Sequence, residues 1–227
     1  MRMRRLATAV AALSLLFTSV GCAAVVPGNA VAAKLEATGG VPRSDDGHGV
    51  VLGTSQDGGA AAIDLFIEPQ CPHCGQFVAE YGDAIAKNIA SNRLAVTVRP
   101  LTFMDYGSDD YSARATNAIF LVAADQAATP ALVWKFIQGL YAKLMSTASH
   151  ADNDGIAKVA NDVGVPADTV NRIAAAEPQV DGNVVSDGNL SVMSDYGVER
   201  ATPTVYDTVG KDQVDFDDPE WLDHLVK

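Results

Sequence analysis

Apolar and polar positions follow two different periods along this chain, which predicts a mixture of strands and helices. Continuous apolar runs between turn residues predict strands, and we expect them at 49–52, 61–67, 94–101, 204–208 and around Val214. Apolar residues three and four positions apart predict helices, which we place at 71–91, 111–127, 130–145, 154–163, 166–175, 180–196 and 219–226. This order, with a block of helices between the third and fourth strands, is typical of an α/β domain with one mixed sheet.

The first 22 residues do not fit this pattern and resemble the export signal of a bacterial lipoprotein. Three arginines precede an uncharged apolar run at 6–17, which is short for a membrane span, and small residues lead to Cys22. We expect residues 1–21 to be a signal peptide and Cys22 to carry a lipid, although Ser19 stands where such motifs usually have leucine. Ordinary cleavage just beyond Cys22 is the alternative. Either route predicts a protein of the cell envelope or a secreted one.

The remainder of the chain divides into a tether and one domain. Residues 22–47 are rich in alanine, valine, glycine and proline without a clear period, which is typical of a tether. Residues 48–227 have the length of one ordinary domain. Loss of the signal peptide, with its three arginines and no acidic residue, changes the net charge from −12 to −15. This excess of negative charge argues against nucleic acid as a partner and against electrostatic binding to anionic lipid, but not against a lipid anchor.

Two further cysteines, Cys71 and Cys74, bracket Pro72 and His73 at the predicted start of a helix. Two thiols at this spacing can form or open a disulfide. The helix N-terminus favours the thiolate of Cys71, and His73 can add a donor or a positive charge beside it. Half of a zinc site is the alternative, but the chain has no second pair of this kind and its other three histidines lack ligand spacing.

The surroundings of the two cysteines favour a redox centre. An exported protein works in an oxidising compartment. A structural disulfide between Cys71 and Cys74 would close a very short loop and stabilise little. No third cysteine remains in the domain to serve as a structural partner. We therefore expect thiol–disulfide chemistry that uses neither a cofactor nor a metal.

One acidic residue interrupts the apolar run at 61–67 and is a candidate for handling protons. Asp64 lies seven residues before Cys71, and burial within a strand would raise its pKa. Exposure to solvent is the alternative for this side chain. Glu68 is closer to Cys71 in sequence and is the rival candidate.

The Cys-Pro-His-Cys motif and a downstream Ala-Thr-Pro-Thr sequence at 201–204 resemble the thioredoxin superfamily and, within it, the DsbA-like exported oxidoreductases. Residues 49–53 are also similar to the opening of Gram-positive and actinobacterial members. The resemblance covers about residues 47–227. It implies a thioredoxin fold with a helical insertion, at about 105–198, between the third strand and the cis-proline strand.

The same resemblance implies roles for individual residues. It implies a cis peptide bond before Pro203 that faces the cysteines, with Thr202 touching the sulfurs and the main chain of a substrate. It also implies an acidic residue beneath Cys74 that handles the proton of this thiol. Asp64 is our first choice for that residue.

The residues and the resemblance together predict an exported enzyme that oxidises cysteine pairs. A substrate thiolate would attack Cys71, and a second substrate thiol would then leave Cys71 and Cys74 reduced. The expected partners are reduced or unfolded exported proteins and a membrane quinone-linked oxidoreductase. The short arm before residue 47 favours a monomer over the dimeric isomerases of the superfamily. The alternatives are a disulfide reductase or isomerase of the same fold, a peptide-binding lipoprotein without catalysis, and a metal-delivery protein.

Overall fold

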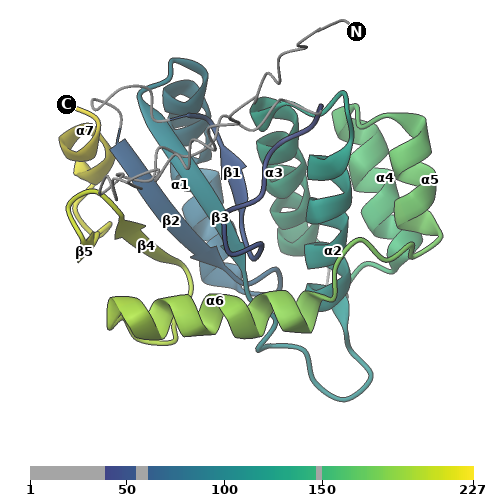
Figure 1. Cartoon of the computed structure of the whole chain (residues 1–227). Coiled ribbons are helices and arrows are strands. Elements are labelled where there is room, and N and C mark those ends of the chain that lie inside the picture. Colours follow the sequence, from purple (N-terminus) through teal and green to yellow (C-terminus); the bar gives the residue numbers. More distant parts are fainter. Residues whose placement is uncertain (1–38, 55–60, 147–149) are drawn as a thin grey trace, which may run out of the picture. The chain divides into compact units, whose positions relative to one another are not determined.

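The computed structural model describes residues 39–54, 61–146 and 150–227. Its strands form one sheet with the order β1-β3-β2-β4-β5 (Figure 1). These strands are β1 (Val50–Leu52), β2 (Ala61–Ile67), β3 (Leu94–Pro100), β4 (Thr204–Asp207) and β5 (Asp212–Gln213). β2 and β3 run parallel, whereas the other neighbouring pairs are antiparallel. The mixed sheet is confirmed. Its last strand, predicted around Val214, ends at Gln213.

Helices cover both faces of the sheet. α1 (Pro72–Ala90) connects the two parallel strands, and α3 (Pro130–Ser146) packs beside it. α6 (Gly182–Tyr196) crosses the other face of the sheet (Figure 1). The remaining described helices are α2 (Tyr111–Ala124), α4 (Asn153–Val163), α5 (Ala167–Ala174) and α7 (Trp221–Leu225). The block from α2 to α6 lies between β3 and β4, which agrees with the helical insertion predicted there.

α1 starts at the residue that the sequence indicated. Cys71 is its N-cap, with extended backbone (φ −75°, ψ 117°), and Pro72 follows in the first turn, where a missing N–H loses no helical hydrogen bond. The apolar positions at spacing four from Phe77 to Ile89 are buried or partly buried against the core. The amphipathic pattern predicted for this helix is therefore confirmed.

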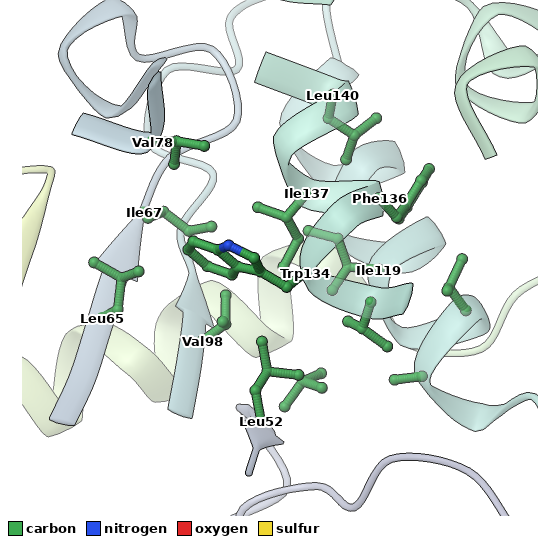
Figure 2. Packing of buried hydrophobic residues seen from close by; sticks show 14 of the residues in the cluster. Leu52, Leu65, Ile67, Val78, Val98, Ile119, Trp134, Phe136, Ile137 and Leu140 are labelled. Atoms are coloured by element: carbon green, nitrogen blue, oxygen red, sulfur yellow. The ribbon is translucent and has the colours of Figure 1, made fainter. Parts of the chain in front are cut away.

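α3 fixes the position of α1 on the sheet. Trp134 of α3 is 1% exposed, and its indole N–H donates to the carbonyl oxygen of Gly82 on α1 at 2.9 Å. Figure 2 shows the same indole pointing toward Ile67 of β2 and Val98 of β3. Because these contacts hold α1, they also hold the cysteine motif at its first turn.

Side chains at helix ends account for two differences from the predicted bounds. α2 stops at Ala124 rather than at residue 127, because Asp125 takes an extended backbone conformation and its carboxylate accepts the N–H of Ala127 at 2.8 Å. α6 starts at Gly182, two residues later than predicted, because Asp181 caps it.

The start of the described chain belongs to the domain. Val41 is 6% exposed, and its N–H donates to the carbonyl oxygen of Ala123 at 2.8 Å. Val41, which falls within the tether predicted at 22–47, is thus part of the core of the domain. The predicted signal peptide and Cys22 lie outside the described residues. No described helix combines the length and the apolar character that a membrane span requires.

Candidate active site

Cys71 and Cys74 lie at the start of α1, directly after the carboxyl end of β2. Both are free thiols, and 6% of Cys71 but none of Cys74 is exposed. The two cysteines are one helical turn apart, and the N–H of Gly75 closes this turn by donating to the carbonyl oxygen of Cys71 at 3.2 Å. A reaction partner can therefore approach Cys71 and not Cys74.

The surroundings of Cys71 stabilise its thiolate. Its pKa is lowered to about 5, chiefly because the thiol of Cys74 donates a hydrogen bond to its sulfur. Burial opposes this change but is outweighed. The N–H groups of Cys74 and His73 at the helix N-terminus and the side chain of Thr202 lower the pKa further.

Cys74 has the opposite tendency. Complete burial raises its pKa far above that of an ordinary thiol, and the hydrogen bond that it gives to Cys71 raises it further. Cys74 therefore keeps its proton until another group removes it.

The second motif meets the first, as the resemblance implied. The peptide bond between Thr202 and Pro203 is cis, and the thiol of Cys71 donates to the carbonyl oxygen of Thr202 at 3.4 Å. This contact joins residues 131 positions apart. Thr204 then begins β4, so Thr202 and Pro203 are held at the end of a strand beside the reactive sulfur.

Pro72 and His73 lie on the exposed side of the motif. His73 contributes its main-chain N–H to Cys71, as described above. The part predicted for its imidazole in stabilising the thiolate stays a prediction.

The structure places Asp64 away from the cysteines, and our first choice of acidic residue is wrong. Asp64 is buried, but its carboxylate accepts hydrogen bonds from Arg99 Nε at 2.5 Å and from the hydroxyl of Tyr196 at 2.8 Å. Tyr196 belongs to α6. Successive residues of a strand point to opposite faces, so Asp64 lies on the face covered by α6, while α1 packs on the other.

Glu68, the rival candidate, lies beside the redox pair. It is fully buried, and its carbonyl oxygen accepts the N–H of Cys71 at 2.9 Å. Its carboxylate accepts hydrogen bonds from the hydroxyl of Ser112 and from the N–H of Gln70, the latter at 2.6 Å. Burial raises the pKa of Glu68 to about 7, more strongly than these hydrogen bonds lower it. A carboxyl group with this pKa can exchange a proton near neutral pH.

The insertion supplies two residues of this site that the sequence did not indicate. Ser112 is the second residue of α2, and Tyr141 is a residue of α3. The hydroxyl of Tyr141 donates to the carbonyl oxygen of Glu68 at 3.1 Å and is within hydrogen-bonding reach of Cys74. These residues lie 44 and 73 positions from Glu68 in sequence, and a serine or tyrosine in a helix carries no local signal of such a contact.

A comparison with protein-family models finds a match, described as thioredoxin, over residues 47–227. The chain belongs to the thioredoxin family. It is also 29% identical over 184 residues to the serine/threonine-protein kinase PknE of Mycobacterium tuberculosis. That match covers 78% of this chain and 31% of the kinase, so the chain spans about a third of the length of the curated relatives it matches.

Solved structures of thiol-disulfide oxidoreductases share the fold of this thioredoxin-family chain. The MdbA protein of Corynebacterium matruchotii has a TM-score of 0.70 at 21% identity, covering 83% of this chain and 92% of that one. MdbA of Corynebacterium diphtheriae gives 0.68 at 19% identity, covering 82% and 93%. Oxidised DsbA of Mycobacterium tuberculosis gives 0.60 at 21% identity, covering 78% and 92%. These likenesses are likenesses of fold, and they agree with a thioredoxin fold of the DsbA type.

Two further features of this thioredoxin-family site concern what could bind there. A hollow of about 410 Å³ adjoins His73 and Pro203, between α1 and the segment 214–219. Within the described residues, no group of three or more histidine, cysteine and acidic side chains is arranged to hold a metal ion.

Proposed function

We propose that this protein is an exported thiol:disulfide oxidoreductase that oxidises cysteine pairs in secreted proteins. The observation that carries the proposal is the contrast between the two thiols. Cys71 is reachable and has its pKa lowered to about 5, whereas Cys74 is buried and has its pKa raised. A stabilised thiolate is a good leaving group, which favours transfer of the disulfide to a substrate.

The first step joins the substrate to the protein. A substrate thiolate attacks the sulfur of Cys71 in the oxidised protein, and a mixed disulfide forms while the Cys71–Cys74 bond breaks. The sulfur of Cys74 leaves with the bonding electron pair and takes up a proton, for which we propose Glu68 as the donor because the pKa of its carboxyl group is raised to about 7. The carbonyl oxygen of Thr202, 3.4 Å from the sulfur of Cys71, marks where the main chain of the substrate would lie.

The second step releases the oxidised substrate. A second substrate thiolate attacks the substrate sulfur of the mixed disulfide, and Cys71 leaves as a thiolate. Two electrons have then passed from the substrate thiols to Cys71 and Cys74. Turnover requires an acceptor for these electrons, for which we propose a membrane quinone-linked oxidoreductase, reached by a protein that a lipid on Cys22 holds at the membrane.

The reduction potential of the exported protein, measured by equilibrium with glutathione, tests the direction of this chemistry. A value near about −120 mV is expected for an oxidase, whereas about −270 mV is typical of a reductase and about −180 mV of an isomerase. Either of the two lower values would overturn the oxidase and leave a thiol–disulfide enzyme of another direction.

Two variants test the proposed order of steps in the same assay. Cys74→Ser is expected to accumulate a mixed disulfide with glutathione, because Cys71 attacks oxidised glutathione, one glutathione leaves as a thiol and no Cys74 remains to resolve the adduct. Cys71→Ser forms no such adduct. A pair that cannot be cycled between disulfide and dithiol at all would instead support the peptide-binding lipoprotein.

A further inference from the structure

The hollow beside the redox centre has an aromatic wall. Phe77 of α1 lies 5.3 Å, between ring centroids, from both Tyr81 and Phe216. The hydroxyl of Tyr81 donates to the carbonyl oxygen of Phe216 at 3.1 Å, which holds the segment 214–219 against α1. His73 and Pro203 also line the hollow, so it adjoins the place where Cys71 contacts Thr202.

Two carboxylates line the same hollow. Glu80 on α1 and Asp217 in the facing segment are both exposed, and both lie close to the phenol of Tyr81. Neither forms an ion pair with a basic side chain of the described chain. The carboxylates are therefore available to a charged group that enters the hollow.

The surroundings of the hollow are also negative. Residues 212–220 contain five acidic residues and no basic one. Arg200, close in sequence to Pro203, lies over the ring of Phe103 at 5.0 Å and is not among the residues that line the hollow. Within the described residues, His73 is the basic side chain that lines it.

We infer that this hollow binds a lysine or arginine side chain of the substrate, next to the substrate cysteine that attacks Cys71. The inference rests on the proposed function and names its substrate class. Aromatic faces attract cations, and exposed carboxylates pair with them, so the two kinds of group together suit an ammonium or guanidinium group. A basic residue beside the substrate cysteine also lowers the pKa of its thiol, which increases the share of the reactive thiolate.

Two dicysteine peptides provide the test. They are identical except that lysine or glutamate follows the first cysteine, and their oxidation by the oxidised full-length protein is measured as kcat/KM. We expect the lysine peptide to be favoured about tenfold over the glutamate peptide. The double variant Glu80→Gln and Asp217→Asn should reduce the ratio to about twofold, the remainder reflecting the reactivity of the peptides themselves.

A matched control separates the hollow from the overall charge of the protein. Asp154→Asn with Asp187→Asn removes the same number of charges from exposed positions on α4 and α6, outside the hollow, and should leave the tenfold ratio unchanged. The wild-type ratio should also fall as salt is added, because exposed charge pairs are screened. This second measurement does not depend on any variant.

Three outcomes would overturn the inference. They are equal oxidation of the two peptides by the wild-type protein, a ratio that survives in the double variant, and a ratio that the distant control variant lowers equally. A failure of the proposed function would be recognised separately, because the reduction potential would then be that of a reductase or an isomerase, or the cysteine pair would not cycle at all.

Discussion

At the scale of single residues, Cys71 and Cys74 are three positions apart and have pKa values displaced in opposite directions. One hydrogen bond contributes to both displacements, because Cys74 donates it and Cys71 accepts it. Cys71 is thus a leaving group at neutral pH, whereas Cys74 attacks only after losing its proton. We propose that Glu68, with its pKa raised to about 7, takes this proton.

The variant Glu68→Gln tests this assignment. It is expected to slow the attack of Cys74 on a mixed disulfide held at Cys71 by about a hundredfold, the usual contribution of one general base. The inflection of the rate near pH 7 should disappear with the carboxyl group. The measurement is the rate at which glutathione leaves an adduct with Cys71, followed from about pH 5 to pH 9.

Asp64→Asn is the control for that experiment, because it alters a carboxylate on the other face of the sheet. Its rate should keep the inflection near pH 7. A Glu68→Gln protein with an unaltered pH profile would remove Glu68 from the mechanism.

The two acidic candidates also show how far sequence reasoning reaches at this scale. The cysteines and the Thr202–Pro203 pair could be found, because each belongs to a short and specific motif. The sequence could not decide between Asp64 and Glu68. The alternation of side chains along β2 assigns its residues to two faces of the sheet, but it does not indicate which face α1 covers. Glu68 comes directly after the last residue of β2, so the period of the strand says nothing about its side chain.

At the scale of the elements, α6 is joined to the sheet through a buried guanidinium group. Arg99 on β3 donates to Asp64 at 2.5 Å, to Asn189 of α6 at 3.1 Å and to Asp46 at 2.9 Å. The amide of Asn189 in turn donates to the carbonyl oxygen of Pro100 at 2.8 Å. These bonds satisfy the polar groups that lie between α6 and β3.

Asp64→Asn is expected to lower the free energy of unfolding by about 3 kcal/mol, because it leaves a buried guanidinium group with less compensating charge. Asp46→Asn alters a carboxylate on the same guanidinium group, but 35% of that side chain is exposed, so its loss should be below about 1 kcal/mol. Urea unfolding of the two variants and the wild type gives the comparison. Equal losses would contradict the view that burial makes the Asp64 contact the stronger one.

The positions of most elements were predictable and their neighbours were not. The spacing of apolar residues placed α1 and β2 within about one residue, because burial on one or both faces leaves a periodic mark on the sequence. This periodicity does not indicate which helix or strand packs on a buried face. The contacts of α6 with β3, and of α2 and α3 with Glu68, depend on residues far apart in the chain.

At the scale of the whole molecule, the folding stability of the reduced protein and that of the oxidised protein should depend differently on pH. The lowered pKa of Cys71 stabilises the reduced fold fully above the pKa of an unfolded thiol, about 8.5, and this contribution disappears as the pH falls through about 5. The raised pKa of Glu68 has the opposite effect on stability. It stabilises the fold at low pH, and this contribution disappears as the pH rises through about 7. Cys71 cannot titrate in the disulfide, whereas Glu68 titrates in both states.

The stability of the reduced protein relative to the oxidised protein should therefore increase from about pH 5 to about pH 8.5. Urea unfolding of both forms across this range measures the difference, and the contribution that Glu68 makes in both forms largely cancels. Parallel curves for the two forms would show that Cys71 is not held as a thiolate in the fold.

The described chain enters the domain at the end of α1 that is far from the redox pair. Gly40 and Val41 line a hollow together with Ile89 and Ala90 of the last turn of α1, whereas Cys71 precedes the first turn. The 19 residues of this helix span about 28 Å. The point at which residue 39 enters the domain thus lies at the end of α1 away from the sulfurs, and the end that carries the sulfurs is left clear of it for a long polypeptide.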